Sequence, residues 1–270
     1  LALPAVPGVE AVGVVEAVAD DVQGLQPGDR VAYAGLPVGS YAAFRNLPAS
    51  MAIKLPAGLA DMAVAGSFLR GLTAHMLMER VCTLKPGQTM LIHAAAGGLG
   101  LILIQWAKQK GLRTIGTVSN ADKAELAIAH GLDHPVIYTQ CDFVTEVLRL
   151  TDGIGANYAI DGVGGDMLTA TFAATKLFGT VASIGQTAGP LPPIDPKLLT
   201  NRQLIRPSIL ALLADKAAYR DAAQAWLDRL AGTIKVEIGS IYALTDAAQA
   251  HADLEQRRTT GAVRLSVDDA

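Results

Sequence analysis

Three glycines lie between two strongly apolar segments of the chain, residues 90–92 and 101–107. The glycines are Gly97, Gly98 and Gly100. The apolar run before them predicts a buried strand, and the helical spacing of apolar residues after them predicts a helix. A strand, a glycine turn and a helix open a dinucleotide-binding unit, in which N–H groups at the helix start bind a pyrophosphate.

This turn departs from the usual G-x-G-x-x-G pattern. Gly97 and Gly100 occupy the second and third glycine positions, but Ala95 stands at the first. An ordinary strand-to-helix turn explains a lone glycine-rich stretch equally well. The turn alone therefore supports a cofactor-binding turn and an ordinary strand-to-helix turn about equally. The rest of the sequence has to decide between them.

Strands and helices alternate after residue 110. The predicted strands span 113–118, 135–138, 157–161 and 180–185, and the predicted helices span 121–130, 142–150 and 166–176. Strands separated by single helices pair in parallel through right-handed crossovers. The pattern favours an α/β fold in which a Rossmann-type, doubly wound parallel sheet surrounds the glycine turn.

The regions on either side of this alternation have other patterns. Short valine-rich segments with Gly and Pro turns predict a barrel-like β unit in residues 1–60, with strands at 11–19 and 39–44 among them. Helices are predicted between 59 and 80, with Gly66 and Gly71 between them or at a close packing contact. The C-terminal part predicts a strand or helix at 202–213, a helix at 216–230, a strand at 236–242, a helix at 246–257 capped by Thr245 or Asp246, and a strand at 261–267 that returns to the first β unit.

The composition is that of a globular chain. Its 270 residues suggest about two domains, and 51% of them are hydrophobic while 17% are charged. The net charge of −3 and the lack of a basic run argue against nucleic acid as a partner. No apolar stretch approaches the ~20 residues of a membrane span. Cys82 and Cys141 stand alone, which predicts free thiols in a reducing compartment and the cytoplasm as the default location.

The cofactor preference depends on the end of the second strand. An acidic residue about 20 positions beyond the glycine turn would select NAD. Here that position falls on Ser119 or Asn120, which are neutral, and Lys123 follows. A neutral strand end near a cation suits the 2′-phosphate of NADP, although Asp122 would repel it if it pointed inward. Alternatively, Lys123 is a solvated lysine on a helix surface.

Other strand ends carry residues that suit the ligand crevice. Tyr138 ends the third strand, Gly162 and Gly164 follow the fourth, and Gly185 ends the fifth. The carboxyl ends of parallel strands face the ligand, and small residues there let a ring lie against the backbone. A rim tyrosine and ordinary helix-entry glycines remain the alternatives.

No other catalytic set is present in the sequence. It has no H-E-x-x-H metal motif, no G-x-S-x-G nucleophile elbow and no phosphate-binding P-loop. His93 precedes the glycine turn, and core packing or a backbone hydrogen bond is its expected role. Hydride transfer needs few protein groups because the cofactor carries the chemistry, so no catalytic side chain is assigned.

Several motifs together resemble the medium-chain dehydrogenase/reductase superfamily, and within it the zinc-free quinone oxidoreductase branch that includes zeta-crystallin. The resemblance covers essentially the whole chain. It rests on Pro7-Gly-Val-Glu-Ala-Val-Gly, Leu25-Gln-Pro-Gly-Asp-Arg-Val, Gly39-Ser-Tyr-Ala, Gly71-Leu-Thr-Ala, His93-Ala-Ala-Ala-Gly-Gly-Leu-Gly and Arg257-Arg-Thr-Thr-Gly-Ala-Val.

This resemblance implies a GroES-like β domain at residues 1–70 and 208–270 and a Rossmann domain at 71–207. It implies NADPH-dependent reduction of a quinone or a related α,β-unsaturated carbonyl, by a homodimer. Lys123, Tyr138 and Arg257 would hold the 2′-phosphate. The full set of implied NADPH contacts is Thr73, Gly97, Gly98, Leu99, Ser119, Lys123, Tyr138, Gly162, Gly185, Gln186 and Arg257.

Two departures from zinc-dependent relatives support a metal-free enzyme. Their His-Glu pair is Val9-Glu10 here, and the four-cysteine zinc loop is absent. The chain also begins at Leu1, and we expect an upstream segment that in this family lines the nicotinamide pocket. Reduction of an enone or enoyl double bond, and non-catalytic NADPH binding as in crystallins, are the alternative functions.

Overall fold

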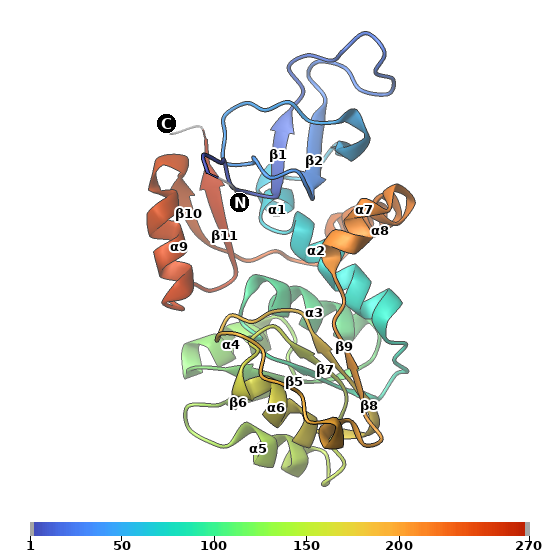
Figure 1. The fold of residues 1–270 in the computed structure, drawn as a ribbon, viewed down its shortest axis with the longest axis vertical. Coiled ribbons are helices and arrows are strands. Elements are labelled where there is room, and N and C mark those ends of the chain that lie inside the picture. Colours follow the sequence, from blue (N-terminus) through green and yellow to red (C-terminus); the bar gives the residue numbers. More distant parts are fainter. Residues whose placement is uncertain (1–2, 268–270) are drawn as a thin grey trace. The chain divides into compact units, whose positions relative to one another are not determined.

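The computed structural model describes residues 3–267 as two compact units (Figure 1). The first unit comprises Leu1–His75 with Ile209–Ala270, and the second comprises Met76–Ser208. The division falls beside the domain boundaries expected at 70/71 and 207/208. The second unit is therefore one continuous segment, inserted between the two parts of the first.

The second unit is built on a six-stranded parallel sheet. Its strand order is β6-β5-β4-β7-β8-β9, the doubly wound order in which the chain reverses direction between β4 and β7. The strands are β4 (Thr89–Ile92), β5 (Arg113–Val118), β6 (His134–Ile137), β7 (Ala156–Asp161), β8 (Thr175–Ser183) and β9 (Gln203–Ile205). The helices are η2 (Met76–Val81), α3 (Gly98–Gln109), α4 (Ala121–Ala129), α5 (Phe143–Leu150), α6 (Asp166–Ala173) and η3 (Pro196–Leu199).

Helices cover both faces of this sheet (Figure 1). Helices α3 and α4 lie over one face, and α5 and α6 lie over the other, where Phe143, Leu168 and Phe172 pack against buried strand residues. The central strands β4 and β5 are buried along almost their whole length, because helices cover both faces of the sheet. The predicted Rossmann-type α/β fold is confirmed.

The first unit contains two small sheets. Strands β1 (Glu10–Val14), β2 (Arg30–Ala34) and β3 (Ile53–Lys54) form an antiparallel sheet, and β10 (Ile238–Ala243) pairs in parallel with β11 (Ala262–Ser266). The accompanying helices are η1 (Ala49–Met51), α1 (Asp61–Ala65), α2 (Phe68–His75), α7 (Ile209–Ala214), α8 (Lys216–Gly232), η4 (Leu244–Asp246) and α9 (Ala247–Glu255).

Two glycines allow close packing within the first unit, as the sequence predicted. A Cβ on Gly71 would lie 2.0 Å from Cδ2 of the buried Trp226 of α8. A Cβ on Gly66 would lie 2.3 Å from the side chain of Ile238. The absence of side chains at these positions lets α2 contact α8 and brings β10 close to the end of α1.

Several expected elements differ from the observed ones. Residues 39–44 form no strand, because Gly39 and Tyr41 donate backbone hydrogen bonds to Gly8 and Pro7 outside any ladder. Helix α6 ends at Ala173 rather than 176, since β8 already pairs with β7 at Thr175. The segment 202–213 holds both a strand and a helix. Strand β1 ends at Val14, short of 19, and the Asp246 side chain makes no capping hydrogen bond.

Candidate functional site

The glycine turn leaves the start of α3 open. Gly97 is the N-cap, no side chain caps the helix, and its first turn contains no acidic residue. By contrast, the side chains of Asn120, Asp142 and Asp215 cap α4, α5 and α8. An uncapped helix start presents N–H groups and the positive end of the helix dipole, so it suits an anion such as a pyrophosphate.

The alanine in place of the first glycine is compensated on the neighbouring strand. The left-handed residue of the turn is Ala94, with φ of 52°, so Ala95 needs no glycine-like backbone. The Ala95 side chain is buried next to Gly116 of β5, where a Cβ would lie only 2.6 Å from it. Gly100 packs the helix against the turn, because a Cβ there would lie 2.6 Å from the carbonyl oxygens of Ala94 and Ala95.

The ends of β5 and β6 bring the expected phosphate-binding residues to one edge of the sheet. Ser119 follows β5, Tyr138 follows β6, and the Tyr138 N–H donates to the Val118 carbonyl at 3.1 Å. The Asn120 side chain is occupied as the cap of α4, where it accepts from the backbone N–H of Lys123 at 2.9 Å. Of the two neutral residues, Ser119 therefore has the side chain that is not used for capping.

The two charged residues at this edge differ in exposure. Lys123 lies half-buried in the first turn of α4, and Asp122 beside it is exposed. The complication raised for Asp122, an inward-pointing carboxylate, is thus not observed.

Backbone hydrogen bonds connect the loop after β7 to the loop after β8. The Ile184 N–H donates to the Asp161 carbonyl at 2.8 Å, and the Ala188 N–H donates to the Val163 carbonyl at 2.9 Å. A Cβ on Gly185 would lie 2.5 Å from the Gly162 carbonyl oxygen. Gly162, Gly185 and the exposed Gln186 therefore lie on neighbouring loops at the carboxyl end of the sheet.

The last two expected contacts belong to the first unit. Thr73 lies on α2, where its hydroxyl donates to the Leu69 carbonyl at 2.8 Å. Arg257 is exposed and follows α9, with φ of 59°. The N–H groups of Arg257 and Arg258 donate to Leu254 and Asp253 carbonyls in the pattern of a Schellman motif, whose left-handed position usually holds glycine.

Replacing Arg257 by glycine is expected to separate stability from binding. Glycine removes the backbone strain and should raise the free energy of unfolding by up to about 1 kcal/mol. Loss of the guanidinium should weaken NADPH binding about tenfold. Asp152 occupies the same left-handed position after α5, with φ of 54°, so Asp152→Gly is the matched control. Denaturant titration and NADPH fluorescence measure both effects, and an unchanged NADPH affinity for Arg257→Gly would contradict the assignment.

The sequence analysis missed the role of Asp161 and its surroundings. Asp161 ends β7, is fully buried, and accepts backbone hydrogen bonds from Val163 at 2.7 Å and Gly164 at 3.1 Å. His93 is buried at the end of β4, with its ring nitrogens 2.9 Å from Thr117 Oγ1 and 2.8 Å from Thr171 Oγ1. The expected core role of His93 is confirmed, but with side-chain hydroxyls rather than the backbone as partners. An acidic residue closing an apolar strand was the available signal for Asp161.

Burial controls the protonation of His93. Desolvation lowers the pKa of His93 from its ordinary 6.5 to about 4, and the nearby Asp161 charge opposes this shift only in part. The imidazole is therefore neutral near pH 7. In that form it can donate from one nitrogen and accept at the other, as its two hydroxyl partners allow.

Comparisons with known proteins agree with this geometry. Residues 1–57 match the alcohol dehydrogenase GroES-like domain, and residues 98–227 match the zinc-binding dehydrogenase domain. Quinone oxidoreductase of Pseudomonas aeruginosa is 37% identical to this chain over 97% of its residues and 82% of the relative's length. The chain belongs to the quinone oxidoreductases of the medium-chain dehydrogenase/reductase superfamily.

Further members of this superfamily are similar in sequence and in structure. The quinone oxidoreductase of Escherichia coli, solved as a complex with NADPH, superposes with a TM-score of 0.93 at 34% identity, over 97% of this chain and 82% of that one. The 2-haloacrylate reductase of a Burkholderia species is 34% identical over 97% of this chain and 81% of the relative's length.

The described residues of this quinone oxidoreductase family member contain neither a candidate metal cluster nor a candidate membrane-spanning helix. Within residues 3–267, no three His, Cys, Asp or Glu side chains come together in a way that could hold a metal ion. None of the described helices is both long and apolar enough to cross a membrane.

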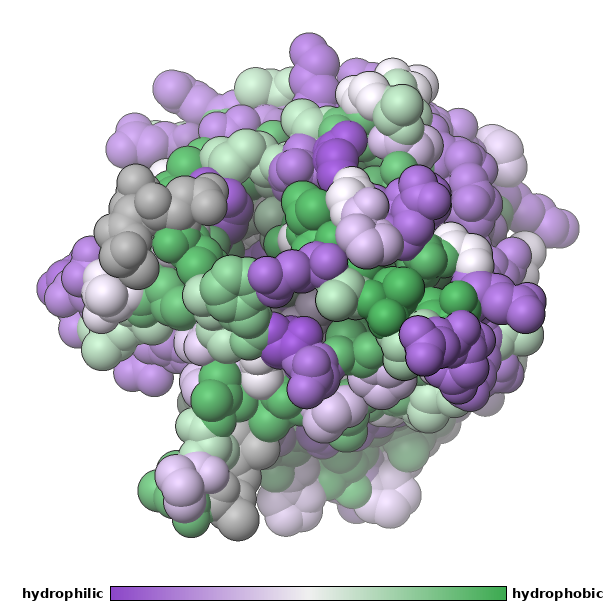
Figure 2. Space-filling view, turned by 90° about the horizontal axis from the view of Figure 1, so that it is seen from above, coloured by the Kyte–Doolittle hydropathy of each residue, from purple (hydrophilic) through white to green (hydrophobic). Residues whose placement is uncertain are grey.

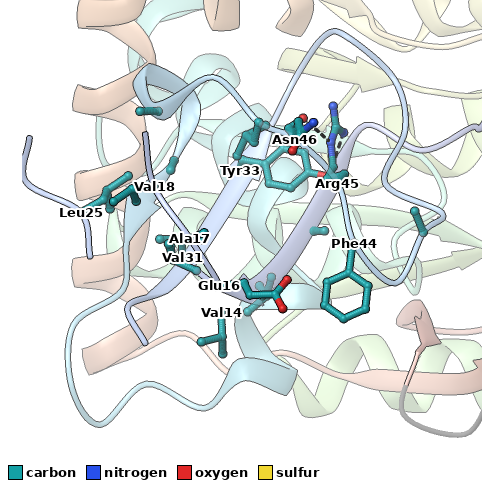
Figure 3. Close-up of a pocket in the computed structure, with 18 of the residues that line it drawn as sticks. Val14, Glu16, Ala17, Val18, Leu25, Val31, Tyr33, Phe44, Arg45 and Asn46 are labelled. Atoms are coloured by element: carbon teal, nitrogen blue, oxygen red, sulfur yellow. Dashed lines mark hydrogen bonds between the residues drawn. The ribbon is translucent and has the colours of Figure 1, made fainter. Parts of the chain in front are cut away.

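A cavity of about 1000 Å³ lies within the first unit (Figure 3). It is lined by β1, β2, the segment from residue 15 to 25 between them and the segment from residue 40 to 52, and none of the expected NADPH contacts lines it. The Arg45 guanidinium lies 4.9 Å from the centre of the Tyr33 ring and donates to the Tyr33 hydroxyl at 2.9 Å. On the face drawn in Figure 2, hydrophobic and hydrophilic residues are interspersed.

Proposed function

We propose that the protein is an NADPH-dependent quinone oxidoreductase that works without a metal ion. The open start of α3 is the observation that carries this proposal, because the structure leaves its N–H groups for an anion. The 34–37% identity to enzymes named quinone oxidoreductase supports the same activity.

The residues present fit NADPH. The turn from Gly97 to Leu99 would bind the pyrophosphate, and Ser119, Lys123 and Tyr138 would surround the 2′-phosphate together with Arg257. Gly162, Gly185 and Gln186 would lie against the nicotinamide half, and Thr73 would contribute from α2. Bound NADPH supplies the hydride, so the work of the chain is to hold the cofactor and orient the quinone.

The proposed activity is tested by following NADPH oxidation at 340 nm with a panel of quinones. We expect turnover with at least one quinone and a micromolar dissociation constant for NADPH. Binding without turnover of any acceptor would overturn the activity, and a millimolar dissociation constant would favour a non-catalytic, crystallin-like protein.

Reduction of an activated carbon–carbon double bond is the second candidate function. The similarity to a 2-haloacrylate reductase supports it, because that relative is 34% identical to this chain, as is quinone oxidoreductase 1 of Escherichia coli. Turnover with 2-haloacrylate, an enone or an enoyl thioester, but with no quinone in the panel, would make this the preferred function.

Reversing the charge of Lys123 is expected to remove the preference for NADPH. In Lys123→Glu the affinity for NADPH should fall about thirtyfold, ~2 kcal/mol, because a charge-assisted contact is replaced by repulsion. The affinity for NADH, which lacks the 2′-phosphate, should change little. Lys85→Glu is the control, since Lys85 lies in the exposed turn before β4. This turn is at the amino end of the strand, whereas the proposed cofactor residues follow the carboxyl ends of the strands. Equal losses for both cofactors would refute the assignment.

The assembly and the setting of the enzyme extend the proposal. Strand β9 is at the edge of the six-stranded sheet, and Ile205 on it is 37% exposed. Such an edge can pair with a second copy, so we propose a homodimer that uses the segment 202–213. A monomer at micromolar concentration in analytical ultracentrifugation would refute it. We also propose that the enzyme is located in the cytoplasm, which the two free cysteines support. We further propose domain boundaries at 70/71 and 207/208, which the nearby division into two units supports.

A further inference from the structure

Polar residues form a row across four neighbouring strands of the large sheet. Ile92 is level with Gly116 of β5 and Ile160 of β7, so His93 is level with Thr117 and Asp161, one residue further along each strand. Asp161 is in turn paired in register with Ser183 of β8. Paired residues of neighbouring strands share a face. The last row of the sheet is therefore polar and buried, unlike the two rows directly before it, which contain only apolar residues and glycine.

The acidic side chain of this row is Asp161. One carboxylate oxygen accepts the two backbone N–H groups already described, while the other, Oδ2, is buried and has no hydrogen-bond partner among the described residues. No cationic side chain among residues 3–267 forms an ion pair with it, and the neighbouring His93 is neutral near pH 7. The Ser183 hydroxyl beside it is also buried without a partner.

Such an arrangement is costly for the folded protein. Burying an unpaired carboxylate and an unpaired hydroxyl destabilises a structure, and neutral residues could close β7 equally well. A neutral asparagine would still accept both backbone N–H groups through its amide oxygen. Holding the loop in shape therefore does not by itself explain why this position carries a charge.

The position of the charge indicates which part of the cofactor it would affect. In this strand order the ligand crosses the carboxyl ends of the strands at the reversal between β4 and β7. The proposed 2′-phosphate residues Ser119, Lys123 and Tyr138 follow β5 and β6. The nicotinamide half therefore belongs over the ends of β7 and β8, where Asp161 lies under the joined loops of Gly162 and Gly185.

We propose that the buried Asp161 carboxylate stabilises the oxidised cofactor relative to the reduced one. When NADPH gives up a hydride, two electrons and the hydrogen leave together, and the nicotinamide ring gains one positive charge. The quinone that accepts the hydride takes a proton from solvent to complete the hydroquinone. A fixed negative charge near the ring favours this change. Its repulsion of the phosphates is the same for both cofactor forms, so that repulsion does not alter the difference between their affinities. The inference rests on the proposed function.

The test measures binding of both cofactor forms rather than turnover. In Asp161→Asn we expect the dissociation constant of NADP⁺ to rise about tenfold while that of NADPH stays within about twofold, since a unit charge in a partly buried site is lost and only the oxidised ring carries a positive charge. Isothermal titration calorimetry gives the NADP⁺ value, and nicotinamide fluorescence gives the NADPH value. Asp133→Asn is the matched control, because Asp133 also accepts a backbone N–H, from Thr114 at 2.7 Å, but after α4.

The possible outcomes distinguish a failure of this inference from a failure of the proposed function on which it rests. If the unaltered protein does not bind NADPH, the proposed function fails. If it binds NADPH but Asp161→Asn changes both affinities equally, or neither, the electrostatic role is wrong while the function stands. Asp161→Ser, also neutral and able to accept a hydrogen bond, is used if the asparagine variant does not fold. Failure of both neutral variants to fold would assign Asp161 a purely structural role and overturn the inference.

Discussion

Replacing Gly100 by alanine is expected to destabilise the protein by about 3 kcal/mol and to abolish measurable NADPH binding. The added Cβ would lie 2.6 Å from two carbonyl oxygens and 2.8 Å from the carbonyl carbon of Ala95. These are backbone atoms of the turn, so relief requires the start of α3 to move away from β4. The N–H groups at the start of α3 form the proposed pyrophosphate site, and this displacement would misalign them. Chemical denaturation and fluorescence titration measure the two effects.

A second helical glycine is the control for this substitution. Gly232 is the last residue of α8, and no atom lies within 4 Å of the place where its Cβ would be. Gly232→Ala should be neutral or stabilising by up to about 1 kcal/mol, because alanine is the better helix former. If Gly100→Ala behaved like Gly232→Ala, the turn would be more adaptable than its contacts indicate, and the proposed cradle would be wrong.

Acidification is expected to destabilise the fold by about 3 kcal/mol through His93 alone. In the unfolded chain His93 takes up a proton below its ordinary pKa of 6.5, whereas in the folded protein burial lowers that pKa to about 4. Between these values the unfolded state binds the additional proton. The free energy of unfolding therefore falls as the pH is lowered from about 6.5 to about 4, and is unaffected by this residue above that range.

Denaturant titrations at pH 7 and at pH 4.5 measure this effect. His93→Gln cannot gain a charge, yet its amide can still reach a hydroxyl, so the variant should lose much less stability on acidification. His130→Gln is the control, because its Nδ1 lies 2.9 Å from the Leu126 carbonyl oxygen outside the buried row. Equal acid sensitivity of the unaltered protein and His93→Gln would show that other groups control it.

The large sheet followed from sequence because its signals are local. Apolar runs of strand length, Asn120 and Asp142 before helices, and the glycine turn each specify their own element, and parallel pairing follows from their alternation. The first unit was harder to predict. Gly39 and Tyr41 form hydrogen bonds with Pro7 and Gly8, about thirty residues earlier, and no local pattern distinguishes this arrangement from a strand.

The positions of the candidate site residues were predictable where they depend on strand ends and not where they depend on neighbouring strands. Ser119, Lys123 and Tyr138 stand at or just after the ends of two expected strands, and the carboxyl ends of parallel strands meet at one edge of a sheet. The surroundings of Asp161 could not be predicted. Which residues lie beside it depends on the register of β7 with β4 and β8. The sequence also left open which of Ser119 and Asn120 has a side chain available to a ligand, because the Asn120 cap of α4 is visible only in the structure.

The contact between Ala95 and Gly116 has a consequence for how this fold evolves. The space that a fingerprint glycine would leave in the turn is found instead on the adjacent strand, so the two positions share one volume. Either residue can hold the methyl group, but both cannot hold it at once. Substitutions at 95 and 116 should therefore be correlated across related sequences. The exchange Ala95→Gly with Gly116→Ala should be tolerated better than Gly116→Ala alone, since only the Leu132 side chain, whose terminal carbons lie 2.9 Å from the added Cβ, would then have to shift.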